Sequence, residues 1–168
     1  MRCFLYIFFY LTFASTVTGQ QVENPEFQKR LETLLENNVP TIDVKDAFIQ
    51  CDNYTFLDAR EKKEFQTSHI PEALHIGYDF FSISNLDGVP KESKIIIYCS
   101  VGYRSEKITQ RLIKEGYTNV FNLYGSIFEW ANQEYPLEDE RGNTTREVHT
   151  YNKAWSKWID HPDVVKVW

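Results

Sequence analysis

The run KIIIYC at residues 94–99 is the feature that most restricts how this chain can fold. Its apolar residues are consecutive rather than alternating, which is typical of a strand buried on both faces of a parallel sheet. Residues 104–116 follow, with Ile108, Leu112 and Ile113 at helical spacing, and end on a glycine, a common residue just after a helix. Together the two patterns predict a buried strand that leads almost directly into a helix.

Helical and β-rich patterns alternate along the rest of the chain. Helical spacing occurs in residues 25–37, 44–50, 60–68 and 126–133, and β-rich runs occur in residues 40–43, 54–59, the start of 73–81 and 119–124. Strands that alternate with helices in this way predict an α/β domain with a mainly parallel sheet. In such sheets ligands bind beyond the carboxyl ends of the strands, and Cys99 falls at that end of its strand.

The size and charge of the chain limit the classes of partner. Its 168 residues suffice for one domain, and 42% hydrophobic with 25% charged residues is ordinary for a globular protein. The net charge is −6, and lysine and arginine form no cluster. A chain with an acidic excess and no basic block is not expected to bind nucleic acid.

The first twenty residues differ from the rest. Arg2 precedes an apolar run from Phe4 to Ala14, and small residues follow up to Gly19. This order is typical of a secretory signal peptide, and the run is too short for a comfortable membrane span. We therefore expect residues 1–19 to be removed and the mature protein to be exported, periplasmic or secreted, without a membrane anchor. A retained N-terminal anchor is the alternative.

Cys51 and Cys99 are the two cysteines outside that segment, and an oxidising compartment makes a disulfide the first possibility to weigh. Cys51 precedes the strand at 54–59, whereas Cys99 ends its own strand, so parallel strands would place them at opposite edges. A strand length of roughly 15 Å, at about 3.3 Å per residue, then separates them. A disulfide requires Cα atoms within about 7 Å, so we predict two free thiols.

The loop from Cys99 to Arg104 has the pattern C-x-x-G-x-R and suits an anionic sulfur. The N-terminus of the following helix offers unpaired N–H groups and a partial positive charge, and a short turn can point its own N–H groups inward. Gly102 allows a positive φ, and Arg104 adds a cation. Such surroundings lower the pKa of a cysteine thiol and make it reactive. The alternative is a buried cysteine beside an ordinary turn.

Three separated motifs resemble the rhodanese family of sulfurtransferases and occur in the family's order. Residues 56–76, FLDAREKKEFQTSHIPEALHI, are similar to its segment D-x-R-x-x-x-E-[FY]-x-x-x-H-I-P-G-A. Residues 95–105 resemble its active-site strand and loop, and residues 117–137 resemble its closing strand, glycine turn and tryptophan-containing helix. The resemblance implies a rhodanese-like three-layer α/β/α domain over residues 38–137, with a mainly parallel central sheet of about five strands.

The same resemblance makes Cys99 the nucleophile. It would take a sulfane sulfur from a donor such as thiosulfate, hold it as a persulfide, and pass it to a thiol or cyanide-like acceptor, without a metal or an organic cofactor. The outer sulfur would be bound by backbone N–H groups of the loop, those of Ser100, Val101, Gly102, Tyr103 and Arg104. Arg104 would close the loop, and the ring of Tyr103 would either wall the pocket or face solvent.

Supporting roles are expected for Asp58, Arg60 and His69. We expect Asp58 and Arg60 to form an ion pair or hydrogen-bond anchor near the loop. We expect His69 to be a buried side chain that fixes the segment before Pro71. Glu72 stands where the family usually has glycine, which predicts a local change of that turn.

Loop length and composition separate the competing functions. The six residues from Cys99 to Arg104 match the family's sulfurtransferases, whereas the related phosphatases have one residue more. Ser100 stands where thiosulfate-preferring members often carry a basic residue, so thiosulfate is expected to bind weakly. The alternative function is a non-catalytic or sulfur-carrying module that binds a partner protein.

Residues 20–37 and 138–168 lie outside the resemblance and are interpreted as an N-terminal helical extension and a C-terminal extension. In the second of these, four apolar residues recur at helical spacing: Tyr151, Trp155, Trp158 and Ile159. We expect a helix that packs on the domain, or one that presents an aromatic surface to a protein partner.

Overall fold

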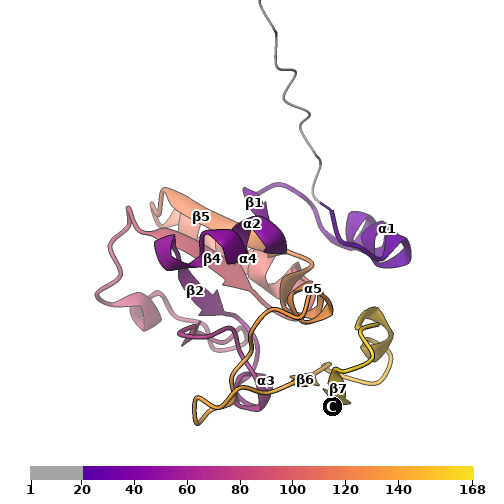
Figure 1. Cartoon of the computed structure of the whole chain (residues 1–168). Helices are drawn as coiled ribbons and strands as arrows, with labels where there is room; N and C mark the ends of the chain where they lie inside the picture. The colour runs from indigo at the N-terminus through magenta and orange to yellow at the C-terminus, as the bar shows by residue number, and fades with distance from the viewer. Residues whose placement is uncertain (1–20) are drawn as a thin grey trace, which may run out of the picture.

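Five parallel strands form the central sheet in the computed structural model, which describes residues 21–168 (Figure 1). The strands lie side by side in the order β1-β5-β4-β2-β3. Their bounds are Thr41–Asp43 for β1, Thr55–Asp58 for β2, Leu74–His75 for β3, Lys94–Tyr98 for β4 and Asn119–Tyr124 for β5. Each neighbouring pair is parallel, which confirms the predicted α/β fold with a parallel sheet of five strands.

The central strand β4 is covered on both faces. Ile96 and Tyr98 pack in a hydrophobic core on one side of the sheet, while Ile95 and Ile97 pack in a second core on the other. Alternate residues of a strand point to opposite faces, so a strand covered on both faces requires a consecutive apolar run. Cys99, the next residue of the chain, belongs to the second core.

Helices supply the outer layers of the domain. Their bounds are Pro25–Leu34 for α1, Val44–Ile49 for α2, Lys62–Thr67 for α3, Tyr103–Lys114 for α4 and Ser126–Asn132 for α5. The buried apolar residues of α1, α2 and α5 join the core of Ile96, and those of α4 join the core of Ile97. The sheet therefore lies between two helical layers, as the resemblance implies.

The C-terminal segment does not form the helix that its aromatic spacing predicts. Residues 151–155 are bends and turns, and Ser156–Trp158 is a single 3-10 turn. On either side of these residues lie two short strands, β6 (Glu147–His149) and β7 (Val165–Val167), which pair in parallel apart from the central sheet (Figure 1).

The chain forms only a short turn where this helix was predicted. The side chain of Asn152 accepts hydrogen bonds from the N–H groups of Ala154 and Trp155 at 2.9 and 3.2 Å, as an N-cap residue does at the start of a helix. The turn that they begin ends with the 3-10 turn Ser156–Trp158, and Ile159 is extended. Tyr151 has a φ of +64°, in the left-handed region, so the backbone has already left the right-handed helical conformation there.

The segment nevertheless packs on the domain. Ile159 is fully buried, and the ring of Trp158 stacks on Phe27 of α1 with 5.4 Å between ring centroids. Val148 of β6 joins the same core. The C-terminal segment and α1 therefore support one another beside the sheet.

Three expectations from the sequence concern the whole chain. Within residues 21–168, no helix has the length and apolar character needed to cross a membrane. The expected signal peptide, residues 1–19, lies outside the described residues. Cys51 precedes β2 and Cys99 follows β4, so the parallel pairing of these strands places the cysteines at opposite ends. Both thiols are free, as predicted.

Candidate active site

The loop between β4 and α4 holds Cys99 at the carboxyl end of the sheet. Gly102, at the start of α4, has a φ of +115°, the left-handed conformation predicted for it. Its N–H donates to Cys99 Sγ at 3.2 Å, and Ser105 Oγ donates to the same sulfur at 3.5 Å. The cysteine is buried, yet its sulfur has two hydrogen-bond donors in reach.

These contacts set the protonation of the thiol. Burial raises the pKa of Cys99, because a charge is less stable away from water. The positive charge of Arg104 and the hydrogen bonds from Ser105 and Gly102 outweigh burial, so the pKa of the thiol lies below its ordinary value. The thiol therefore ionises more readily than an ordinary cysteine, and the thiolate is the nucleophilic form.

Glu64 of α3 is the partner of Arg104. The two terminal nitrogens of Arg104 donate to the two carboxylate oxygens of Glu64, and both distances are 2.7 Å. Ser100 Oγ joins the pair by donating to Glu64 at 3.1 Å and accepting from Arg104 at 2.9 Å. Burial raises the pKa of Glu64, but Arg104 outweighs it and holds that pKa below the ordinary value. The positive charge that Arg104 places near Cys99 is therefore balanced by the carboxylate of Glu64.

Two further buried residues hold the loop in place. Ser126 Oγ accepts the N–H of Cys99 at 3.1 Å and donates to the carbonyl of Leu123 at 3.1 Å. Asn122 Nδ2 donates to the carbonyl of Gly102 at 3.1 Å. The start of the loop and its glycine are therefore tied to the end of β5 and the start of α5.

Sequence patterns did not identify Glu64, Ser105, Asn122 or Ser126 as site residues. All four are buried, and buried polar groups need partners, but periodicity does not show which polar residues are buried. For Glu64 alone a signal was present, since it is the acidic residue that closes the D-x-R-x-x-x-E pattern of the first motif.

Asp58, Arg60 and His69 lie where structural support was expected. Arg60 Nη2 is 2.6 Å from the carboxylate of Asp58, and both side chains are fully buried. Burial lowers the pKa of Arg60, but Asp58 outweighs it and raises that pKa above its ordinary value. His69 is buried, with Nδ1 3.0 Å from the carbonyl of Phe65 and Nε2 3.3 Å from the carboxylate of Glu138.

A cavity of about 420 Å³ opens onto the loop. Five of the predicted site residues line it: Cys99, Ser100, Val101, Tyr103 and Arg104. Side chains from other segments complete the lining: Leu34, Glu61, Tyr78, Asp79, Tyr151 and Trp155. Tyr103 meets both of its expected positions, because it lines the cavity and is also 42% exposed. The cavity has mainly apolar and aromatic walls around the reactive sulfur.

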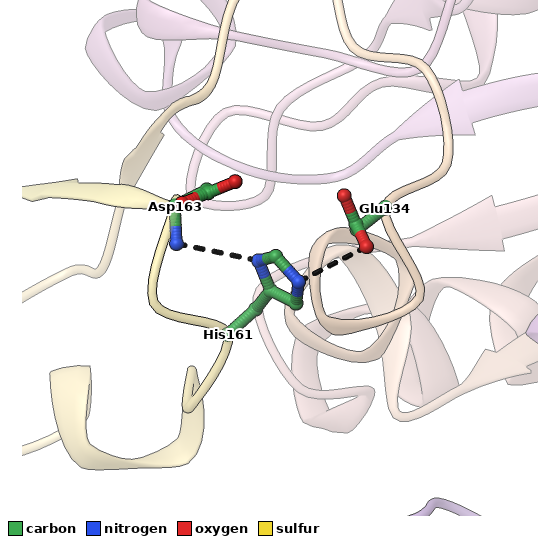
Figure 2. A group of neighbouring side chains, drawn as sticks. All are labelled: Glu134, His161 and Asp163. Carbon is green, nitrogen blue, oxygen red and sulfur yellow. Dashed lines mark hydrogen bonds and ion pairs between the residues drawn. The ribbon is translucent and has the colours of Figure 1, made fainter.

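Glu134, His161 and Asp163 bring three potential metal ligands within 4.8 Å of one another (Figure 2). His161 Nε2 is 3.1 Å from the carboxylate of Glu134, and Nδ1 accepts the N–H of Asp163 at 3.3 Å. Arg146 pairs with both carboxylates, at 2.5 Å from Asp163 and 3.9 Å from Glu134. These contacts already use both ring nitrogens and both carboxylates. They tie the residues after α5 to those before β7.

Comparisons with known proteins agree with this architecture. Residues 41–133 match the Rhodanese-like domain family. The chain is 27% identical over 106 residues to a protein named Sulfurtransferase from Allochromatium vinosum, covering 63% of this chain and 98% of that protein. A rhodanese-related protein from Thermoplasma volcanium has a similar structure, with a TM-score of 0.51 and 26% identity over 58% of this chain and 96% of that one.

Relatives whose names give another activity also match part of the chain. The chain is 31% identical over 84 residues to the tRNA uridine(34) hydroxylase of Pectobacterium atrosepticum, covering 46% of this chain and 23% of that protein. The family match runs from β1 to α5 and leaves α1 and the C-terminal segment outside it.

Proposed function

Because this chain belongs to the rhodanese-like domain family, we propose that it moves a sulfane sulfur from a donor such as thiosulfate to a thiophilic acceptor through a persulfide on Cys99. The family match and the relative named a sulfurtransferase support sulfurtransferase activity in general. One observation carries the persulfide step: Cys99 borders the cavity, and its Sγ accepts hydrogen bonds from Gly102 and Ser105. A sulfur in these surroundings is stabilised as the attacking thiolate.

In the first step the Cys99 thiolate attacks the outer sulfur of thiosulfate. A new S–S bond forms at Cys99 as the S–S bond of thiosulfate breaks, and its electron pair leaves with sulfite. The product is the persulfide anion of Cys99. Its negative charge would be stabilised by Arg104 and by the loop N–H groups of residues 100–104 at the N-terminus of α4.

In the second step the acceptor attacks the outer sulfur of the persulfide. With cyanide, a C–S bond forms, the S–S bond to Cys99 breaks, and thiocyanate leaves while the Cys99 thiolate returns. With a thiolate acceptor, the outer sulfur becomes the persulfide of the acceptor. Neither step uses a metal or an organic cofactor.

The test is a cyanolysis assay on the wild type and on the Cys99→Ser variant, with thiosulfate and with organic sulfane donors. We expect the wild type to produce thiocyanate and the variant to produce none. Mass spectrometry should show the wild type heavier by one sulfur atom after exposure to the donor alone. Equal inactivity of both proteins with every donor, and no added sulfur, would remove the enzyme hypothesis.

A sulfur-carrying module is the second candidate function. The bidentate pairing of Arg104 with Glu64 favours it, because a balanced cation attracts a thiosulfate dianion weakly. A carrier would still acquire a persulfide on Cys99 but would release sulfur to small acceptors slowly. The rate of persulfide loss on addition of cyanide, measured in a single turnover, separates the two functions.

We also propose that the protein is exported. The order of charged, apolar and small residues in the first nineteen positions supports this proposal. N-terminal sequencing of the full-length product, expressed in a host that exports it, should find a start near Gln20. A product that retains Met1 would contradict it.

A further inference from the structure

We propose that the cavity over Cys99 selects sulfane donors with an apolar body of aromatic size, represented by aryl thiosulfonates, over thiosulfate. This inference rests on the proposed sulfur transfer and names the substrate class of the same site. It is carried by side chains outside the family match, by the charges around the cavity, and by the size of the space.

The first observation is where the walls of the cavity come from. Leu34 of α1, Tyr151 and Trp155 line it together with the loop residues, and all three lie outside residues 41–133. Tyr78 adds another ring to the lining. The reactive loop therefore lies beneath apolar and aromatic surface contributed by both extensions of the chain.

Cationic side chains lie over both of these added rings. The guanidinium of Arg30 lies 5.5 Å from the ring centroid of Trp155, and that of Arg104 lies 5.5 Å from the ring centroid of Tyr151. The backbone N–H of Tyr151 also donates to His149 Nδ1 at 3.1 Å. Tyr151 and Arg104 therefore contact one another in the lining of the cavity that Cys99 also borders.

The second observation is the charge around the cavity. Arg104 is the cation of the lining, and Glu64 already binds it through both terminal nitrogens. The acidic residues Glu61 and Asp79 also line the cavity. Both repel a dianion such as thiosulfate, and the ion pair with Glu64 weakens the attraction that Arg104 offers it. A singly charged donor with an apolar body meets less repulsion and also removes apolar surface from water.

The third observation is size. A volume of about 420 Å³ lies within the range of sites for organic ligands. A thiosulfate ion would fill only a small part of this space, whereas a benzene ring attached to the reacting group would contact the aromatic walls.

The chemistry follows the proposed mechanism. The Cys99 thiolate attacks the outer sulfur of the aryl thiosulfonate anion, and an S–S bond forms at Cys99. The S–S bond of the donor breaks, and its electron pair leaves with the arenesulfinate anion. One persulfide anion and one sulfinate anion replace one thiolate and one thiosulfonate anion, so atoms and charge balance without any other reactant.

The test compares kcat/KM for benzenethiosulfonate and methanethiosulfonate, with cyanide as the acceptor, in the wild type and in variants. Both donors are single anions that release a sulfinate, and they differ only in the group on the sulfonyl sulfur, a phenyl ring or a methyl group. Comparing the ratio between proteins cancels the intrinsic difference between the leaving groups. We expect the benzene-to-methane ratio to fall about tenfold in Trp155→Ala and several-fold in Tyr151→Ala. Thiosulfate should be the poorest of the three donors in the wild type.

Trp168→Ala is the matched control, because this ring also belongs to the C-terminal segment but does not line the cavity. It should leave the ratio unchanged. Tyr151 is 58% exposed, so its replacement does not disturb the core and keeps the test valid if Trp155→Ala fails to fold. A ratio equal to that of the wild type in Tyr151→Ala and in every folded Trp155 variant would overturn the inference.

A binding measurement separates this inference from the proposed function. If the wild type turns over no donor, calorimetric titration with benzenesulfinate and methanesulfinate still reports the selectivity of the cavity. Tighter binding of benzenesulfinate, weakened by Tyr151→Ala, would support the cavity inference while sulfur transfer fails. Equal affinity for the two sulfinates would overturn the inference.

Discussion

Arg104 and Glu64, forty positions apart in the sequence, form a two-pronged ion pair with both nitrogen–oxygen distances at 2.7 Å. The same carboxylate accepts a hydrogen bond from Ser100, so Glu64 fixes two residues of the reactive loop. The pair places a cation where it lowers the pKa of Cys99 and leaves little net positive charge for a substrate. Several measurable consequences depend on this relationship.

Replacing Glu64 by Gln should remove the buried carboxylate that pairs with Arg104 and leave the positive charge of Arg104 unbalanced. We expect the free energy of unfolding to fall by about 3 kcal/mol, because a buried ion pair that loses one member leaves an uncompensated charge. The KM for thiosulfate should fall, since the dianion then meets an unbalanced cation. Urea unfolding and cyanolysis kinetics measure the two effects. Glu36→Gln is the control, because Glu36 pairs with Lys107 at the surface and should change neither quantity much. A higher KM for thiosulfate in Glu64→Gln would contradict the balanced-charge explanation.

Replacing Arg104 by Gln should raise the pKa of the Cys99 thiol. The positive charge lowers that pKa in the wild type, and burial, which raises it, is then less opposed. The rate of alkylation by iodoacetamide, followed against pH, should therefore begin to rise at higher pH in the variant. Lys107→Gln removes a cation from the same helix that does not contact the sulfur, and its profile should match the wild type. Coincident profiles for Arg104→Gln and the wild type would show that the cation does not control the thiol.

Gly102→Ala should lose both stability and activity. Its φ of +115° costs a residue with a side chain about 1–2 kcal/mol, although the added carbon would meet only ordinary contacts, the nearest at 3.5 Å to Leu35. Relief of that strain would turn the N–H away from Cys99. Gly88, with a φ of +92° in open surroundings, gives the matched variant Gly88→Ala. Both variants should unfold at lower urea concentration, but only Gly102→Ala should lose sulfur transfer. Full activity in Gly102→Ala would mean that this N–H is dispensable.

Asp58→Asn should destabilise the fold without touching the cavity. It leaves the fully buried guanidinium of Arg60 without its carboxylate, which we expect to cost about 3–5 kcal/mol. Adding Arg60→Met to this variant should recover part of the loss, because the unpaired charge is then removed as well. Urea unfolding of the single and double variants measures both changes. A loss below about 1 kcal/mol in Asp58→Asn would show that the pair adds little to stability.

Stability should fall in acid partly because of Glu64. The pKa of this carboxyl is lower in the folded protein than its ordinary value of 4.5, so the unfolded chain binds the proton more readily. Its contribution is complete above the ordinary pKa and is lost as the pH falls through the lowered folded value. The free energy of unfolding of Glu64→Gln should therefore depend less on pH below about pH 4.5 than that of the wild type. Urea titrations over this pH range test the difference, and parallel curves would refute it.

Much of the fold could be predicted from local patterns. The consecutive apolar residues of β4 predicted a strand covered on both faces, and Ile95 to Tyr98 are indeed fully buried. The helix after the loop, the positive φ of Gly102 and the free thiols of Cys51 and Cys99 were also predicted correctly. The helix and the conformation of Gly102 depend on neighbouring residues. The separation of the two thiols depends on the parallel direction of the strands, which the alternation of strands and helices predicts. The chemical roles of the loop residues stay predictions until the variants are assayed.

The C-terminal segment shows where local patterns mislead. The spacing from Tyr151 to Ile159 predicted a helix, but Tyr151 has a left-handed φ of +64° and the helical conformation is limited to the 3-10 turn Ser156–Trp158. The aromatic residues still contact the domain: Trp158 stacks on Phe27 of α1, and Tyr151 and Trp155 line the cavity. Spacing records which residues are apolar, but it does not fix the backbone conformation of a short segment.

The sequence by itself determined the buried strand and the chemistry of the loop that follows it. These features are a cysteine at the carboxyl end of the strand, and a glycine and an arginine at the start of the next helix. Only the tertiary structure decided that Glu64 pairs with Arg104 and that Tyr151 and Trp155 line the cavity beside Cys99. Glu64 is 40 positions from Arg104, and Tyr151 and Trp155 are more than 50 positions from Cys99, so no local period encodes these pairings. Whether a carboxylate or an aromatic ring is buried depends on distant residues that the folded sheet brings beside it. These long-range contacts set the charge and shape of the cavity that a donor meets at Cys99.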